Sequence, residues 1–336
     1  MTTHATPPIL AVPGATPMLS ARLDEGLARV DAVLHEVIDH DDAYIAQASG
    51  HLLAAGGKRF RPLLALLAAE LCDGITDEVV RAAAGVELTH VASLYHDDVL
   101  DAADIRRGIP SVNVTYDNST AILVGDLIFG KASELIADLG AEAVKIQARA
   151  FVRLCAGQIR DDRPCPPGTD PVDYYLGVLA DKTGVLIATA GRYGVMFGGG
   201  SPETAEILTA YGEKVGIAFQ LADDLIDIAS DADDTGKTPG TDLREGVDTL
   251  VVLRARASVD PADARLRDLL SRDLSDDDAG IAEALRLLRA HPALQQARDE
   301  AVAVAYAAQD LLSPLPDSAA KSALQALALS AVTRIG

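Results

Sequence analysis

The sequence predicts an all-α protein, a single-domain bundle of about ten or more helices. Hydrophobic residues make up 49% of the 336 positions, enough to bury a sizeable core. Aromatic residues reach only 4% and Trp is absent, while Ala and Leu dominate. This composition favours helices packed on helices over a β-sandwich. Apolar residues also recur with helical spacing along most of the chain, and strand-like alternation between turn signals is nowhere convincing.

The helical spacing begins at Ser20 and continues through Ile38. The same period returns in the segments 41–55, 62–73, 76–105, 119–138, 141–160, 171–197, 203–231, 244–257, 277–290 and 293–312, and a last helix is expected to run to about Arg334. Gly and Pro separate these segments. Residues 1–17 contain four prolines among small residues and are predicted to form a flexible N-terminal arm, followed by one domain over 18–336.

Charge and cysteine content exclude several classes of protein. Asp and Glu outnumber Lys and Arg 50 to 29, so general nucleic-acid binding is disfavoured because phosphate neutralisation needs a surplus of basic residues. A polybasic membrane anchor is equally disfavoured, and no window of about 18 uncharged apolar residues could span a membrane. The cysteines Cys72, Cys155 and Cys165 lack CxxC spacing, which implies neither a disulfide framework nor a zinc site. Without a signal-peptide pattern, we expect a cytoplasmic protein.

The sharpest chemical feature is the run Asp97-Asp98-Val99-Leu100-Asp101 near the end of a long apolar helix. At about 3.6 residues per turn, Asp97 and Asp101 stack on one face with Asp98 beside them. Like charges at this spacing repel, and the negative end of the helix dipole is close by. A missing cation would offset both penalties. Carboxylate oxygens without His or Cys favour magnesium, whereas a solvated acidic patch is the alternative for one such cluster.

A second run, Asp223-Asp224-Leu225-Ile226-Asp227, has the same spacing and again lies near the end of an apolar helix. Two such clusters at equivalent helix ends indicate a pair of facing metal sites. The runs Asp39 to Asp42 and Asp276 to Asp278 lack this arrangement.

Basic residues complement these acids. The segment Gly56-Gly57-Lys58-Arg59-Phe60-Arg61-Pro62 places three positive charges where Pro62 would open a helix. Free backbone N–H groups together with Lys and Arg form a natural diphosphate cradle there. Arg106-Arg107, Lys182 and Lys237 add further positive charges.

Together these motifs resemble the trans-isoprenyl diphosphate synthases, or polyprenyl synthetases. The resemblance runs from Gly56 to Leu250 in the order of that family. Its motifs are the basic segment, the first aspartate run through Gly108, Gly125-Asp126, Gly157-Gln158, Lys182-Thr183, the second aspartate run from Phe219 and the segment Gly236 to Leu243. The resemblance implies a magnesium-dependent prenyltransferase of the isoprenoid synthase fold, a homodimeric helical bundle around a central cavity. Residues 18–336 would form its catalytic domain.

The resemblance also implies roles for individual residues. The enzyme would condense isopentenyl diphosphate head to tail with a C10–C20 allylic diphosphate, with three magnesium ions per active site. The expected metal ligands are Asp97, Asp101, Asp223 and Asp227, the last directly or through water, with Asp98 in support. Residues expected to neutralise the allylic diphosphate are Arg106, Lys182 and Lys237. Residues expected to hold isopentenyl diphosphate are Lys58, Arg61, His90 and Arg107. Thr183 and Gln220 would face the allylic cation.

Product length is predicted from the helix before Asp97. Its stripe of Ser93, Ala92, Thr89, Val86, Gly85 and Ala82 holds no aromatic stopper. The helix spans about 22 Å from Ala82 to Asp97 and accommodates about five isoprene units, which favours products of C25 or longer. Ala92, Ser93 and Thr89 are the predicted chain-length residues, and Phe129 is a candidate floor.

Several alternatives stay open. A C20 geranylgeranyl diphosphate synthase would have a floor in this channel. A class I terpene cyclase would share an aspartate motif but would not need the basic segment. A non-catalytic partner subunit usually loses aspartates, and both motifs are complete here. Where many family members have Lys and Pro, this chain has Val247 and Val251, so we expect weaker allylic diphosphate binding.

Overall fold

Helices form nearly all of the regular structure in the computed structural model, which describes residues 12–229 and 239–333. These residues fall into two compact units. The described residues of unit 1 lie within 1–152, 186–212 and 314–326, and those of unit 2 lie within 153–185, 213–313 and 327–336. The all-α prediction is therefore confirmed. Among the described helices, none is both long and apolar enough to cross a membrane.

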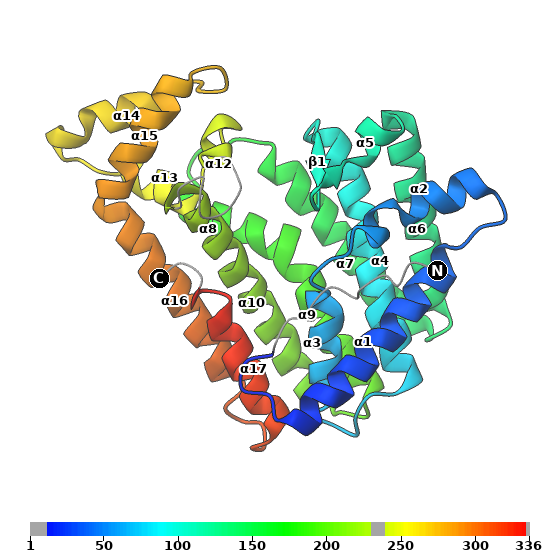
Figure 1. Cartoon of the computed structure of the whole chain (residues 1–336). Coiled ribbons are helices and arrows are strands. Elements are labelled where there is room, and N and C mark those ends of the chain that lie inside the picture. The colour runs from blue at the N-terminus through cyan, green and yellow to red at the C-terminus, as the bar shows by residue number, and fades with distance from the viewer. Residues whose placement is uncertain (1–11, 230–238, 334–336) are drawn as a thin grey trace. The chain divides into compact units, whose positions relative to one another are not determined.

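Unit 1 is organised around one long buried helix, α4 (Asp77–Leu100). Helix α4 packs against α1 (Pro17–Ile38), α3 (Phe60–Ala69) and α6 (Asn118–Ala137), as Figure 1 shows. The Thr76 side chain caps the start of α4 by accepting the Val79 N–H. Most α4 side chains between Val79 and Tyr95 are buried, so this helix holds its last turn in a fixed place.

The other elements of unit 1 are shorter or are shared with unit 2. Helix α2 (Ala43–Ala54) precedes the basic segment, and the two-residue strands β1 (Ile105–Arg106) and β2 (Ile109–Pro110) form a small hairpin before α5 (Val112–Thr115). Helices α7 (Ala141–Asp161), α9 (Val185–Phe197), α10 (Pro202–Ala229) and α17 (Ala319–Ser330) have residues in both units.

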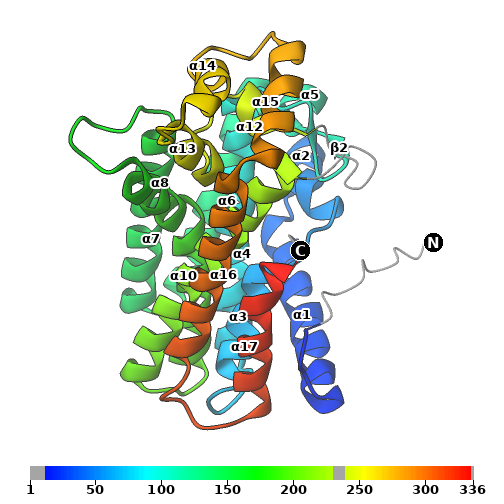
Figure 2. The same ribbon diagram turned by 90° about the vertical axis from the view of Figure 1, so that its left-hand side faces the viewer.

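Unit 2 has its own apolar core beside the second half of α10. That core includes Leu221 and Leu225 from α10 and Leu250 and Val251 from α13 (Leu250–Arg256). Helix α13 packs against α16 (Pro292–Leu311), the long helix that follows α15 (Asp278–Ala290) in Figure 2. Unit 2 also contains α8 (Pro171–Leu179), the π-helix η1 (Ala180–Gly184), α12 (Thr241–Arg244), the 3₁₀-helix η2 (Pro261–Asp263) and α14 (Ala264–Leu270).

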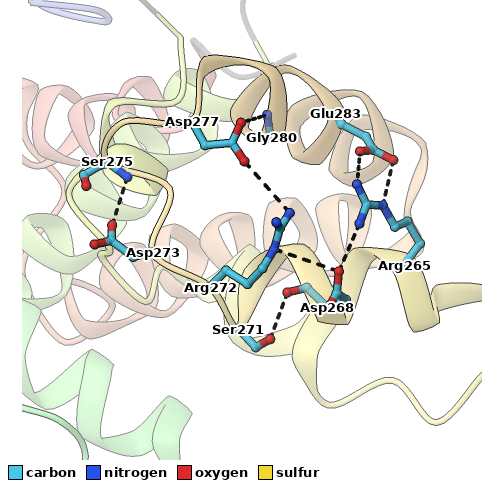
Figure 3. Close-up of polar contacts among 9 residues, drawn as sticks. All are labelled: Arg265, Asp268, Ser271, Arg272, Asp273, Ser275, Asp277, Gly280 and Glu283. Carbon is cyan, nitrogen blue, oxygen red and sulfur yellow. Dashed lines mark hydrogen bonds and ion pairs between the residues drawn. The ribbon is translucent and has the colours of Figure 1, made fainter.

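Exposed ion pairs join α14 to α15. Arg265 pairs with Glu283 of α15 and with Asp268 of its own helix (Figure 3). Asp277 accepts the Gly280 N–H at 2.8 Å and so caps α15.

Three predicted segments differ from the structure. The helix predicted over 76–105 ends at Leu100, and Ile105 begins β1. The segment 171–197 is helical throughout, but the π-helix η1 interrupts it between α8 and α9. The predicted helix 244–257 is wrong, because α12 ends at Arg244 and α13 begins only at Leu250. Gly246 adopts φ +73 between them, a conformation that ends a helix. The helix 264–270 and the β1–β2 hairpin were not predicted.

Candidate active site

The first aspartate motif occupies the last turn of α4, as predicted. Asp97 is partly buried, Asp98 is fully buried and Asp101 is exposed as the C-cap residue. The Asp101 N–H donates to the Asp97 carbonyl at 2.8 Å. Asp97 and Asp101 thus lie one turn apart at the end of a helix whose earlier turns are buried.

Asp98 does not share the environment of its neighbours. Arg106 Nε donates to Asp98 Oδ1 at 2.6 Å, and the Val112 N–H reaches Asp98 Oδ2 at 3.5 Å. Arg106 also lies 3.8 Å from Asp101 Oδ2. Asp98 therefore fixes Arg106 beside the motif, and its support of bound magnesium stays a prediction. The β1–β2 hairpin delivers this arginine, because Arg106 is the last residue of β1.

Arg107 lies next to Arg106 but is used differently. It adopts φ +53, an uncommon left-handed conformation for a residue with a side chain. Its Nη1 donates to the Leu52 carbonyl at 2.7 Å and to the Gly56 carbonyl. A Cβ on Gly57 would lie 3.1 Å from the Arg107 Cζ. Arg107 therefore holds the loop that carries the basic segment, a positioning role the sequence did not reveal.

Arg59 also stabilises the loop that carries the basic segment. Arg59 adopts φ 49 just before α3, and its guanidinium pairs with Asp31 at 2.8 Å and Glu87 at 3.3 Å. Two carboxylates thus neutralise Arg59. Its neighbour Lys58 is exposed, and Arg61 is partly buried on the first turn of α3.

The structure brings two of the predicted isopentenyl diphosphate residues, Arg61 and Arg107, close to a third, His90. Burial is the main reason that the pKa of His90 lies well below its usual value, and nearby positive charges add to the effect. Those charges belong to Arg61, Arg107, Arg106 and Arg59. Burial also lowers the pKa of Arg61 to about 10, while Glu87 opposes that shift. Arg59 and Arg106 are already paired with carboxylates, so Arg61 and Arg107 beside the neutral imidazole are the groups that favour an anion.

The second aspartate motif lies in the last turns of α10, within unit 2. Its middle residue, Asp224, is again buried, but its partners carry no charge. The Tyr175 hydroxyl donates to Asp224 Oδ2, and Gln220 Nε2 donates to Asp224 Oδ1 at 3.0 Å. Burial raises the pKa of Asp224 to about 6, although these two hydrogen bonds oppose the shift.

The third residue of this motif contacts the chain that follows it. Asp227 Oδ1 accepts the Thr241 N–H and Oδ2 accepts the Asp242 N–H, each at 3.2 Å. Asp227 therefore joins the end of α10 to the start of α12. Lys237, expected to bind the allylic diphosphate, lies outside the described residues.

The π-helix η1 presents the predicted Lys182-Thr183 pair. Lys182 Nζ donates to Asp161 Oδ2 at 2.7 Å, and Thr183 Oγ1 donates to Gln220 Oε1 at 3.5 Å. A Cβ on Gly157 would lie only 2.6 Å from the Lys182 backbone nitrogen, which explains the glycine of the Gly157-Gln158 pair. π-helices of one turn occur frequently at functional sites.

Asp181 fixes the same turn. Arg153 Nε donates to Asp181 Oδ1 at 2.7 Å, and Arg160 donates to Asp181 Oδ2. Sequence reasoning missed Asp161, Asp181 and Tyr175. The only available signal was their closeness in sequence to Gly157-Gln158 and Lys182-Thr183.

The predicted chain-length residues lie on a buried face of α4. Ala92 and Thr89 are fully buried, and Ser93 is nearly so. Ser93 donates its hydroxyl to the His90 carbonyl at 2.8 Å, and Thr89 donates to the Gly85 carbonyl at 2.9 Å. Phe129 lies 5.6 Å from the His96 ring, beside Asp97. Phe129 therefore packs against the last turns of α4, and its role as a floor stays a prediction.

Magnesium fits the donors of both motifs without being fully enclosed by them. Among residues 12–229 and 239–333, no group of three or more His, Cys, Asp or Glu side chains forms a metal site by itself. Magnesium usually takes one or two carboxylates and completes its shell with water and substrate phosphate oxygens. Paired carboxylates one turn apart match that requirement.

The helical fold, the two aspartate motifs and the arginine-rich surroundings of His90 define a protein of the isoprenoid synthase class. The chain belongs to the polyprenyl synthetase family, whose model matches residues 42–288. It is 45% identical to a nonaprenyl diphosphate synthase of Mycobacterium tuberculosis, over 95% of each chain.

Solved structures agree. A geranylgeranyl pyrophosphate synthase of Corynebacterium glutamicum, complexed with calcium and isoprenyl diphosphate, is 43% identical with a TM-score of 0.86. The similarity covers 96% of this chain and 98% of that one. A decaprenyl diphosphate synthase of Rhodobacter capsulatus is 34% identical, also with a TM-score of 0.86, over 95% and 99% of the two chains.

Proposed function

We propose that the chain is an all-trans polyprenyl diphosphate synthase that condenses isopentenyl diphosphate with a C10–C20 allylic diphosphate. The observation that carries this proposal is the pair of unlike sites on α4. His90, among four arginines, lies seven residues before Asp97, which is about 10 Å along the helix. One helix thus offers a cationic site and an acidic site at a spacing suited to two diphosphates.

The cationic site suits isopentenyl diphosphate, whose diphosphate group stays bonded to carbon in the reaction. Arg61 and His90 would bind it directly, and Lys58 is exposed on the same loop. Arg107 would contribute charge while it holds the loop through the Leu52 carbonyl. A terpene cyclase binds one diphosphate substrate, so it would not need this second site.

The acidic motifs suit the allylic substrate, whose diphosphate group leaves in the reaction. Magnesium, with three ions by family resemblance, would supply the positive charge that stabilises the leaving diphosphate. Asp97 and Asp101 would be magnesium ligands in unit 1, and Asp223 and Asp227 would be magnesium ligands in unit 2. Arg106 and Lys182 would bind diphosphate oxygens, which requires Lys182 to exchange its bond with Asp161 for one with substrate. Gln220, fixed by Asp224, would face the allylic cation together with Thr183.

We propose a product of C25 or longer. Support comes from the small side chains along α4 and from the similarity to nonaprenyl and decaprenyl synthases. Similarity to a geranylgeranyl pyrophosphate synthase favours the alternative, a C20 product. A homodimer and a cytoplasmic location stay predictions, which light scattering and cell fractionation would check.

Purified protein incubated with labelled isopentenyl diphosphate, magnesium and a C10, C15 or C20 primer tests the proposal. We expect dephosphorylated products of C25 or longer. A main product of C20 would support the alternative. Release of a cyclic hydrocarbon, or no incorporation with any primer, would contradict the proposed function.

A further inference from the structure

A buried polar pair inside unit 1 joins Thr89, a predicted chain-length residue, to Gln147, which has no role in the chemistry described above. Gln147 of α7 is 7% exposed, and Thr89 of α4 is 1% exposed. Gln147 Nε2 donates to Thr89 Oγ1, and the Thr89 hydroxyl donates onward to the Gly85 carbonyl. Because the Thr89 hydrogen is already used on Gly85, its oxygen needs a donor, which fixes the orientation of the Gln147 amide.

The Gln147 amide is only partly satisfied. Its Oε1 atom is buried and has no hydrogen-bond partner among the residues that the structure describes. Most buried polar atoms in proteins have a partner, so a partly satisfied amide calls for an explanation. Apolar side chains would fill this space between helices without that penalty.

The pair lies beside the predicted path of the product. Thr89 is eight residues before Asp97, about 12 Å along α4. An extended isoprene unit spans about 4–5 Å, so a chain running along α4 reaches Thr89 with its third unit. The hydrogen bond joins α4 to α7 at that level. One turn before Gln147, Tyr193 of α9 donates to the Ala143 carbonyl, so three helices meet there.

We propose that Gln147 is a product-length residue and that its hydrogen bond to Thr89 is the barrier that a growing chain must part beyond about C15. The inference rests on the proposed function. A hydrocarbon chain offers no donor or acceptor, so its passage leaves the amide and the hydroxyl unpaired in an apolar channel. That penalty slows elongation at the third unit and sets the balance between short and long products.

Two substitutions at Gln147 test the barrier in opposite directions. Gln147→Leu keeps the side-chain size without the hydrogen bond, so we expect the ratio of products beyond C20 to those of C15–C20 to rise about tenfold. Gln147→Phe adds bulk at the same level, so C15–C20 products should accumulate. The assay uses labelled isopentenyl diphosphate, a C10 primer and chromatographic sizing, with thermal unfolding of each variant measured in parallel.

Thr89→Val provides a second approach if a Gln147 variant does not fold. It removes the other half of the hydrogen bond, so the ratio should rise as in Gln147→Leu, and the double variant should add little to either single change. Gln295→Leu is the matched control, because it makes the same chemical change on the exposed surface of α16 and should leave the product ratio unaltered.

The outcomes separate this inference from the proposed function. No incorporation by the wild-type protein would contradict both. Incorporation with wild-type product lengths in the Gln147 and Thr89 variants would overturn the inference alone. A shift toward longer products in Gln147→Phe would also overturn it, because a larger side chain cannot lower a steric barrier.

Discussion

The two aspartate motifs have the same spacing in sequence, but the structure stabilises their buried middle residues in opposite ways. Asp98 in unit 1 faces a guanidinium group, Arg106, at 2.6 Å. Asp224 in unit 2 accepts hydrogen bonds from Tyr175 and Gln220, which are neutral. The last residues differ as well, because Asp101 ends α4 while Asp227 accepts two N–H groups at the start of α12.

This difference shows what a repeated motif does and does not specify. The DDxxD spacing puts the outer carboxylates on one helix face and turns the middle one inward. The neighbouring element, which is the β1–β2 hairpin in unit 1 and α8 in unit 2, then decides whether that buried carboxylate meets a charge or a neutral donor. In unit 2 burial outweighs the hydrogen bonds and raises the pKa of Asp224 to about 6. Unit 1 instead binds Asp98 to an arginine that also belongs to the candidate substrate site.

The largest effect on stability is expected at Arg106. Arg106→Leu leaves the fully buried Asp98 without a counter-charge, and the free energy of unfolding should fall by about 3–5 kcal/mol. Tyr175→Phe removes one neutral donor from Asp224, and the loss should be about 1–3 kcal/mol. Urea unfolding measures both, and Asp98→Asn combined with Arg106→Leu should recover part of the loss. Equal costs at the two positions would contradict the comparison.

The next effect concerns the π-helix of unit 2. In Gly157→Ala the new methyl group would lie 2.6 Å from the Lys182 backbone nitrogen, so Lys182 and Thr183 must shift. We expect kcat/KM for the allylic substrate to fall about ten- to a hundredfold, because small displacements of binding groups are costly. Gly177→Ala on α8 is the control, since its Cβ would meet no atom within 4 Å. Equal activity of the two variants would remove the positioning role of Gly157.

A pH effect is expected from His90 in unit 1. Its native pKa is lowered by burial and by the surrounding arginines, so the unfolded chain binds a proton at a higher pH than the native protein does. Stability should therefore decrease as the pH falls below about 6.5, with a slope approaching 1.4 kcal/mol per pH unit for this group.

His90→Gln should lose this part of the pH dependence, as measured by urea unfolding between pH 7.5 and 5. His35→Gln, a change at an exposed histidine, should keep the wild-type profile. An unchanged profile in His90→Gln would show that His90 is not held neutral in the native protein.

The smallest effect is expected at Val247, where many family members have lysine. Val247→Lys adds a positive charge in unit 2, so KM for the allylic diphosphate should fall by a few fold while kcat changes little. Steady-state kinetics with a C15 primer would measure it. An increase in KM would contradict the expectation that valine at this position removes a contact with the allylic diphosphate.

The sequence predicted the helices that carry the motifs because their apolar periodicity is long and strong. It also predicted that Asp97 and Asp101 share a face, because every α-helix places residues four apart on the same face. It could not separate α12 from α13, because Leu243, Val247 and Leu250 keep helical spacing across the left-handed Gly246.

Side-chain partners from distant segments were beyond the sequence for a different reason. The motif segment Gly56 to Pro62 shows three equivalent cations, yet Arg59 is neutralised by Asp31 and Glu87. Arg107 is tied to the carbonyls of Leu52 and Gly56. Likewise, nothing near Thr89 in the sequence indicates Gln147, which reaches it from α7, 58 residues away in the sequence.

The most direct test is elongation of a C15 primer with labelled isopentenyl diphosphate while magnesium is titrated, in the wild type, Asp97→Ala and Asp223→Ala. We expect no wild-type elongation in EDTA and a rate that rises with magnesium. Each variant should lose about three orders of magnitude in turnover while its unfolding curve stays close to that of the wild type. Elongation without magnesium, or near-normal rates in both variants, would contradict the assignment of the two motifs to metal-bound diphosphate.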